Sequence, residues 1–235
     1  MTGLLQQKPI VVIGSDEIGV GIARRLEREG ARLAVLDAIP DRSIGAAVDN
    51  AAKQLGGIYA LINNLLPTPA LAPLEQQTGA MFADAFARVE AVVQAMQAAM
   101  PFMREAGEGR IVNVGHHYGE AVNEGLAAYN AAASSLIAIT RSAALDWGRY
   151  QIATNLLLPL AHTSELERAQ AKRPNIINLM LSQVPLRRAG DCVEDVGGAV
   201  LFLVSDAANF INGEVLHADG GQHVAGPVLN PIRFA

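Results

Sequence analysis

A chain of 235 residues with 51% hydrophobic and 17% charged residues can bury a full core as one α/β domain, expected to span residues 1–235. The net charge is −5 and Lys and Arg are scattered, which gives no basic surface for nucleic acid or for an anionic membrane. The apolar runs are far shorter than the roughly 20 residues of a membrane span. The single cysteine, Cys192, excludes a disulfide framework, and no spacing of Cys and His residues indicates a metal site. We therefore expect a cytoplasmic protein without a metal.

The first predicted elements are a strand, a glycine turn and a helix. Ile10–Ile13 is a short apolar run of β-branched residues, typical of a central strand that is buried on both faces. The turn GSDEIGVG follows, and a helix is predicted over Ile22–Glu29. This order lets backbone N–H groups and a helix N-terminus meet a pyrophosphate. Gly19 and Gly21 are therefore candidate cofactor-binding residues.

The second predicted strand, Arg32–Leu36, ends at Asp37, about twenty residues after the glycines. An acid at this point can bind both ribose hydroxyls of NAD and repel the phosphate of NADP, and it can equally cap the end of a strand. The next strand is predicted at Ile58–Asn63, so 26 positions lead from residue 37 to residue 63, and they hold one helix, Ser43–Leu55. Because a whole βαβ unit needs about 30 residues, we expect no further strand here.

Predicted helices and strands alternate along the rest of the chain. The strands are short apolar runs and the helices have apolar residues at helical spacing. This alternation predicts a three-layer α/β sandwich around a doubly wound parallel sheet. The remaining elements are expected at Gly79–Met103 (helix), Arg110–Gly115 (strand), Leu126–Trp147 (helix), Ile152–Leu158 (strand), Val193–Val204 (helix) and Gly213–Leu216 (strand).

From Ile10 to Gly221 the chain resembles the short-chain dehydrogenase/reductase family. The resemblance rests on the glycine turn, Asn63-Asn64, the strand Arg110–Asn113, Tyr129, and the block Val193–Gly221 with its Ala-Asp-Gly-Gly turn. It implies a Rossmann-like fold, here one edge strand shorter than the family norm, and an NAD(P)-dependent oxidoreductase with an Asn, Ser, Tyr and Lys tetrad. In that tetrad the Tyr is the general acid/base and the Ser orients the substrate oxygen. The Lys lowers the pKa of the Tyr and holds the cofactor ribose.

Only the Tyr of that tetrad is present. Tyr129 fixes the register, which places Ala133 at the Lys position one helical turn later and His116 at the Ser position thirteen residues earlier. The family spacing places Arg88 at the Asn position. Ala133 supplies neither the cation that lowers the pKa of the phenol nor the donor to the ribose. His116 and its neighbour His117 can donate or accept hydrogen bonds, but histidines after a strand can equally be solvated loop residues.

The cofactor half of the motif also departs from the family. Ser15 stands at the first Gly of the turn, and Asp16 and Glu17 add like charges that oppose an anionic ligand by about 1 kcal/mol or more each. Leucines replace small residues of the cofactor pocket and fill its volume, at Leu65, Leu66 and Leu160. We therefore expect no cofactor. If one binds, it is NAD, with the contacts made by Gly19, Gly21, Asp37 and Asn63.

The losses affect both the cofactor site and the catalytic site, so the leading hypothesis is a non-catalytic subunit that assembles with an active NAD-dependent paralogue. Such pairing occurs in two-component dehydrogenases of the family, among them a hydroxyacyl-CoA dehydrogenase. One alternative is a cofactor-independent lyase or isomerase that uses Tyr129 with His116 and Arg88, as halohydrin dehalogenases use this fold without a cofactor. Another is a working NAD-dependent alcohol/carbonyl oxidoreductase in which the glycine turn and Asp37 suffice.

Two predicted helices form the expected partner surface. Gly79–Met103 has an apolar stripe at helical spacing, and Leu126–Trp147 is rich in small residues. The stripe consists of Val89, Val92, Val93 and Met96. Left in water, the two faces would form a larger apolar patch than monomers usually carry. We expect a dimer or tetramer, either a hetero-oligomer with the paralogue or a homo-oligomer, that Ala131→Arg or Ala132→Arg disrupts. The region Thr163–Arg188 can cover a site or face a subunit.

Overall fold

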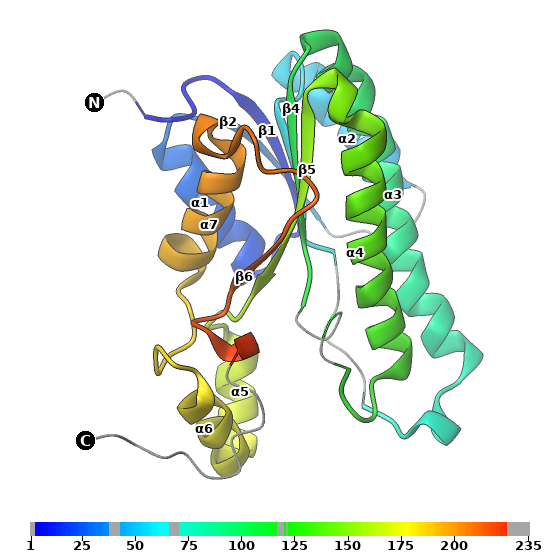
Figure 1. The fold of residues 1–235 in the computed structure, drawn as a ribbon, viewed down its shortest axis with the longest axis vertical. Helices are drawn as coiled ribbons and strands as arrows, with labels where there is room; N and C mark the ends of the chain where they lie inside the picture. Colours follow the sequence, from blue (N-terminus) through cyan, green and yellow to red (C-terminus); the bar gives the residue numbers. More distant parts are fainter. Residues whose placement is uncertain (1–2, 38–42, 66–70, 117–119, 121, 225–235) are drawn as a thin grey trace.

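The computed structural model, which describes residues 3–37, 43–65, 71–116, 120 and 122–224, contains one parallel sheet with helices on both faces (Figure 1). The strand order is β2-β1-β3-β4-β5-β6, and all neighbouring pairs are parallel. The predicted three-layer, Rossmann-like parallel sandwich is therefore confirmed. The strands are β1 (Pro9–Ile13), β2 (Arg32–Leu36), β3 (Ala60–Asn63), β4 (Gly109–Val114), β5 (Ile152–Pro159) and β6 (Val215–Ala218).

The helices divide between the two faces of the sheet. Two cover one face, and three cover the other (Figure 1). The first group is α1 (Glu17–Arg28) and α7 (Gly197–Val204), and the second is α2 (Ser43–Leu55), α3 (Gly79–Ala106) and α4 (Ala127–Trp147). A hairpin of α5 (Ser164–Lys172) and α6 (Pro174–Gln183) lies beyond the carboxyl ends of the strands (Figure 1). Short helical turns are η1 (Leu74–Gln76), η3 (Gly148–Tyr150), η4 (Cys192–Val196), η5 (Asp206–Ala208) and η6 (Gln222–Val224).

The core consists of two apolar layers, one on each face of the sheet. Successive residues of a strand point to opposite faces, so Ile111 of β4 packs with α2, α3 and α4 and the next residue, Val112, packs with α1 and α7. The central strands β3, β4 and β5 are buried along their whole length. Continuous apolar strands are what a sheet covered on both faces requires.

β2 forms one edge of the sheet. The chain passes from β2 through α2 directly to β3, which lies on the far side of β1. Over the residues that the structure describes, no strand pairs with the outer side of β2, as the spacing from Asp37 to Asn63 predicts. The edge of the sheet on this side is thus one strand short of the expected family sheet.

The start of α1 differs from the prediction. The helix begins at Glu17, five residues before the predicted Ile22, because the Asp16 side chain caps it by accepting a hydrogen bond from the backbone N–H of Gly19. Gly19 and Gly21 therefore lie in the first turns of the helix and not in a loop before it.

The predicted partner face of α3 is wrong. Val89, Val92 and Met96 are buried within the chain itself, and Val89 packs against Ala128 and Ala132 of α4. The apolar stripe of α3 and the small residues of α4 therefore cover each other, which a single chain can achieve without a second subunit. Of the four predicted stripe residues, only Val93 is partly exposed.

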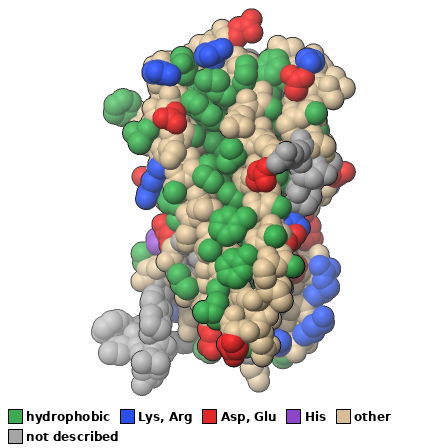
Figure 2. Space-filling model, turned by 90° about the vertical axis from the view of Figure 1, so that its right-hand side faces the viewer, with side chains coloured by type: hydrophobic (Ala, Val, Ile, Leu, Met, Phe, Trp, Pro, Cys, Tyr) green, Lys and Arg blue, Asp and Glu red, His purple; other side chains and the backbone are tan. Residues whose placement is uncertain are grey.

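A different apolar surface lies on the outer side of these two helices. Figure 2 shows hydrophobic side chains along the length of this face. Phe86 of α3 is 42% exposed and Leu145 of α4 is 84% exposed. Ala131, which shares the helical face of Leu145, is exposed as well. None of the described helices is both long and apolar enough to cross a membrane; the cytoplasmic location stays a prediction.

Candidate cofactor and catalytic site

Strands β1, β3, β4 and β5 end along the same edge of the sheet, and the turns after them carry most of the predicted site residues. The chain order reverses between β1 and β3, which pair with each other although β2 separates them in sequence. In open α/β sheets a ligand binds at such a reversal, outside the carboxyl ends of the strands. The turn after β1 and the end of β3 are therefore where a dinucleotide would lie.

The glycines after β1 are required by close packing in the turn and in the first turns of α1. Gly14 has a φ of 109°, and a Cβ there would lie 2.4 Å from the backbone oxygen of Asn64. A Cβ on Gly19 would lie 1.8 Å from the oxygen of Gly14, and one on Gly21 would lie 2.6 Å from the Cβ of Cys192. Close packing around α1 accounts for these glycines without a ligand.

The polar groups of this turn bond to one another. Ser15 Oγ donates a hydrogen bond to Asp37 Oδ1 at 2.6 Å, which joins the turn to the end of β2. Asp16 Oδ1 accepts from the backbone N–H of Gly19 at 2.9 Å and from Asn64 Nδ2 at 2.8 Å. The carboxylate predicted to hold a ribose thus accepts from Ser15. The N–H of Gly19, a donor that a phosphate could use, is already bonded to a carboxylate.

The first turn of α1 is surrounded by acidic side chains. Glu17 Oε2 accepts a hydrogen bond from the backbone N–H of Ser164 at 2.8 Å. The pKa of the Cys192 thiol is raised to about 11, first by burial and then by the negative charges of Asp191, Glu17 and Asp16. Charges that oppose a thiolate at this place oppose a pyrophosphate in the same way.

The end of β3 is built into the core. Asn63, predicted as a cofactor contact, is fully buried and donates through Nδ2 to Asn113 Oδ1 at 2.8 Å, while Asn113 donates to Thr140 Oγ1 at 2.9 Å. Asn63 thus ties β3 to β4. Leu65 is 2% exposed and packs in the core cluster of α2, α3 and α4. Leu66 lies outside the described residues.

The described residues at this place carry several features that oppose an anionic cofactor. The helix N-terminus that would receive the pyrophosphate is capped by Asp16, and the acids beside it have the wrong charge for an anionic ligand. Leu65 fills space next to the end of β3, and Asp37 is bonded to the turn.

The structure brings two of the predicted catalytic residues together. Tyr129 lies in the first turn of α4 and is 7% exposed. The ring of His116, at the start of the loop after β4, stands edge-on to the Tyr129 ring with 6.2 Å between the ring centroids. Ala133, one helical turn after Tyr129, is buried and forms a small apolar cluster with Tyr129 and Leu126. The position that the resemblance assigns to an ammonium group is thus apolar.

Arg88 lies on α3 and forms an ion pair with Asp84 of the same helix, with 3.8 Å between Arg88 Nε and Asp84 Oδ2. Four fifths of its side chain is buried, and its Nε is without a hydrogen-bond partner. A catalytic role for Arg88 stays a prediction. His117 lies outside the described residues.

Sequence reasoning missed a cluster of two imidazoles and two carboxylates at the end of β6. The rings of His217 and His223 stack, with 3.9 Å between their centroids. His217 Nε2 lies 2.6 Å from Glu120 Oε2, and His223 Nδ1 lies 3.0 Å from Asp219 Oδ2. Glu120 belongs to the loop that leads from His116 to α4, so this contact joins that loop to β6. Glu120 and His217 are 97 positions apart in the sequence, so no local sequence pattern indicates their contact.

The charge state of Asp219 fixes which ring nitrogen of His223 carries a proton. Burial alone would raise the pKa of the Asp219 carboxyl, but hydrogen bonds from the His223 side chain and from the backbone N–H groups of His223 and Gly221 outweigh burial and lower the pKa. An ionised carboxylate only accepts hydrogen bonds. His223 Nδ1 therefore donates to Asp219. Within the described part of the chain, no group of three or more His, Cys, Asp or Glu residues could hold a metal ion.

Comparison with known proteins gives a family and a common fold. The model of the family described as enoyl-(acyl carrier protein) reductase matches residues 35–223. The 4-formylbenzenesulfonate dehydrogenase of Comamonas testosteroni is 30% identical over 94% of this chain and 99% of its own length. Levodione reductase superposes with a TM-score of 0.87 at 24% identity over 94% of this chain and 99% of that chain. NAD+-bound xylitol dehydrogenase gives a TM-score of 0.82 at 26% identity over 91% and 98%.

Proposed function

Because the chain belongs to the short-chain dehydrogenase/reductase family, an oxidoreductase family, we propose that it acts as a non-catalytic subunit beside an active NAD-dependent paralogue. The observation that carries the proposal is the surroundings of Tyr129. In a hydride transfer the phenol must gain and lose a proton near neutral pH, and in this family a Lys ammonium one helical turn after the Tyr lowers the pKa of the phenol for that step. The residue one turn further along α4 is the buried Ala133, which supplies no charge and no donor.

The phosphate turn gives independent support. Asp16 caps α1, Ser15 is bonded to Asp37, and Glu17 adds negative charge at the same helix end. The proposal therefore includes the absence of a bound dinucleotide. NAD+ is present in the related xylitol dehydrogenase structure. The difference between the two proteins is expected to lie in the turn after β1 and at the end of β3.

The partner surface in this proposal is the outer side of α3 and α4. It carries Phe86, Leu145 and the small exposed residue Ala131, so a second pair of helices can approach closely. A partner that supplies the cofactor and the catalytic residues would complete the enzyme, and this chain would contribute stability and part of the assembly.

A direct test uses the purified chain with and without an active short-chain dehydrogenase from the same organism. The chain alone is expected to give no turnover with alcohols and NAD+ or with carbonyl compounds and NADH. The mixture is expected to sediment as one complex whose activity survives the change Tyr129→Phe in this chain. Activity that depends on Tyr129 of this chain would contradict the proposal.

The contact between His116 and Tyr129 favours a second candidate, a cofactor-independent lyase or isomerase. An imidazole beside a phenol can exchange protons with a substrate at neutral pH, and Arg88 would bind a substrate anion. The third candidate is a working NAD-dependent alcohol/carbonyl oxidoreductase, which the dehydrogenase relatives favour. Nucleotide binding separates the third candidate from the first two. Cofactor-free turnover that Tyr129→Phe abolishes separates the second from the first.

A further inference from the structure

The N-termini of two helices meet at one carboxylate. Glu17 is the first residue of α1, and Ser164 is the first residue of α5. Glu17 Oε2 accepts the backbone N–H of Ser164 at 2.8 Å across 147 positions of sequence. The first N–H groups of a helix have no partner inside the helix. Thr163 caps the N–H of Leu166, and Glu17 of α1 satisfies another of these donors.

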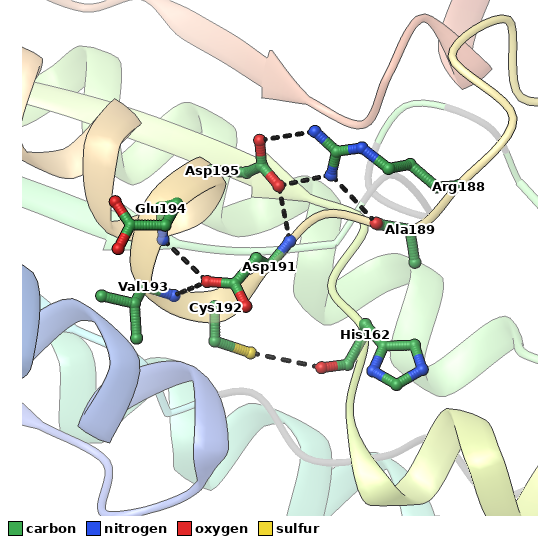
Figure 3. A network of polar contacts seen from close by, with 8 residues as sticks. All are labelled: His162, Arg188, Ala189, Asp191, Cys192, Val193, Glu194 and Asp195. Carbon is green, nitrogen blue, oxygen red and sulfur yellow. Dashed lines mark hydrogen bonds and ion pairs between the residues drawn. The ribbon is translucent and has the colours of Figure 1, made fainter.

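The hairpin that α5 begins is otherwise weakly attached to the body of the protein. α5 contains no buried residue, and none of the described side chains of α6 is buried. At its base the chain is held firmly, because Gly190 N donates to Leu160 O at 2.8 Å and His162 N donates to Gly190 O at 2.7 Å. Figure 3 shows the neighbouring contact, in which Cys192 Sγ donates to the carbonyl oxygen of His162 at 3.4 Å.

A second network fixes the other side of this base. Arg188 forms a two-pronged ion pair with Asp195, whose Oδ2 also accepts the backbone N–H of Asp191 (Figure 3). Asp191 in turn caps η4 by accepting the N–H groups of Val193 and Glu194. The base of the hairpin is thus tied by hydrogen bonds on both sides, and the hydrogen bond from Ser164 to Glu17 joins α5 to α1 beyond that base.

The partial positive charge at the N-termini of α1 and α5 decides that a group bridging these two helices is an anion. The N-terminus of a helix carries partial positive charge and binds an anion. At the reversal between β1 and β3, such an anion would be the pyrophosphate of a dinucleotide. In this chain the N–H of Gly19 near the N-terminus of α1 is bonded to Asp16, and the N-terminus of α5 is bonded to the carboxylate of Glu17.

We propose that Glu17 is a built-in replacement for the cofactor pyrophosphate, and that its hydrogen bond to Ser164 holds the α5–α6 hairpin closed when no dinucleotide is bound. The inference rests on the proposed function in one respect, namely that the chain works without a cofactor. It adds a conformational role: the hairpin keeps one fixed position at any nucleotide concentration.

The test measures amide hydrogen exchange along α5 in the full chain. Glu17→Ala removes the acceptor, and exchange at Ser164 is expected to become about fivefold faster, the order expected for the net loss of one partly exposed hydrogen bond. Glu27→Ala is the matched control, because Glu27 is an exposed acid on the same helix. Glu17→Gln keeps an acceptor without the charge and is expected to give an intermediate rate.

Inorganic pyrophosphate at millimolar concentration provides a chemical rescue. It is expected to slow the exchange of Ser164 in Glu17→Ala and to leave the wild-type rate unchanged. Exchange in Glu17→Ala that equals the wild type, or a faster exchange that pyrophosphate does not slow, would overturn the inference. A wild-type rate in Glu17→Gln would contradict the role of the charge. Tight NAD+ binding by the wild type would refute the proposed function without altering the exchange result, so the two failures are distinguishable.

Discussion

Substitutions at two neighbouring alanines of α4 test the assembly and the stability of the fold separately. Ala131 is exposed on the outer face, whereas Ala132 is 1% exposed and packs with Ala85 and Val89 of α3. Ala131→Arg places its side chain in water and is expected to change the free energy of unfolding by less than about 0.5 kcal/mol. Ala132→Arg forces a guanidinium group between α3 and α4, which is expected to cost at least about 3 kcal/mol because the charge has no partner there.

The effect of Ala131→Arg is expected in the association. At the centre of an apolar helix interface, an arginine is either buried without a partner or holds the helices apart. A cost of about 3 kcal/mol weakens the association by more than about a hundredfold. Ala171→Arg is the matched control, because Ala171 is an exposed helical alanine on α5, away from this face.

Sedimentation measures the association, alone and with the active paralogue, and urea unfolding measures the stability. The reasoning predicts that Ala131→Arg is as stable as the wild type but monomeric, that Ala132→Arg is destabilised, and that Ala171→Arg behaves as the wild type in both assays. Assembly of Ala131→Arg with wild-type affinity would refute the assignment of this face. Equal unfolding midpoints for Ala132→Arg and the wild type would refute the packing argument.

Three further predictions concern the site. The double change Ala133→Lys and His116→Ser is expected to give no alcohol or carbonyl turnover, because the N–H of Gly19 stays bonded to Asp16 and Ser15 stays bonded to Asp37. Formation of NADH from NAD+ and an alcohol would show that the cavity accepts the cofactor. Leu65→Ala is expected to lower the free energy of unfolding in urea by about 2–5 kcal/mol, because the side chain is 2% exposed, and an unchanged midpoint would place it outside the core. The rate of Cys192 alkylation by iodoacetamide is expected to rise with pH up to about 11, since only the thiolate reacts. Glu17→Gln is expected to shift this pH profile to lower pH, because it removes a charge that raises the pKa of the thiol. A wild-type profile centred near 9.0 would contradict the buried, acidic environment of Cys192.

The sequence predicts the sheet well because its strands are separated by clear local signals. Arg32–Leu36 and Ser43–Leu55 form β2 and α2 with the predicted bounds, and the short spacing between Asp37 and Asn63 predicts the missing edge strand. Such features depend on apolar runs and on chain length, which are properties of the sequence itself.

The contacts between elements could not be predicted in the same way. The apolar stripe of α3 is visible at Val89, but the sequence does not tell whether a neighbouring helix of the same chain or a second subunit covers it. Asp16 belongs to a turn with glycines, and only the backbone geometry shows that its side chain caps α1. The pairing of Glu120 with His217 joins distant segments, and no periodicity marks it.

The most direct test of the account is a calorimetric titration of the purified chain with NAD+ and with NADH. The account predicts no binding at millimolar nucleotide, because Asp16 caps the helix that would receive the pyrophosphate and Glu17 and Asp16 give this place negative charge. A dissociation constant in the micromolar range would contradict the central claim and would favour a working dehydrogenase.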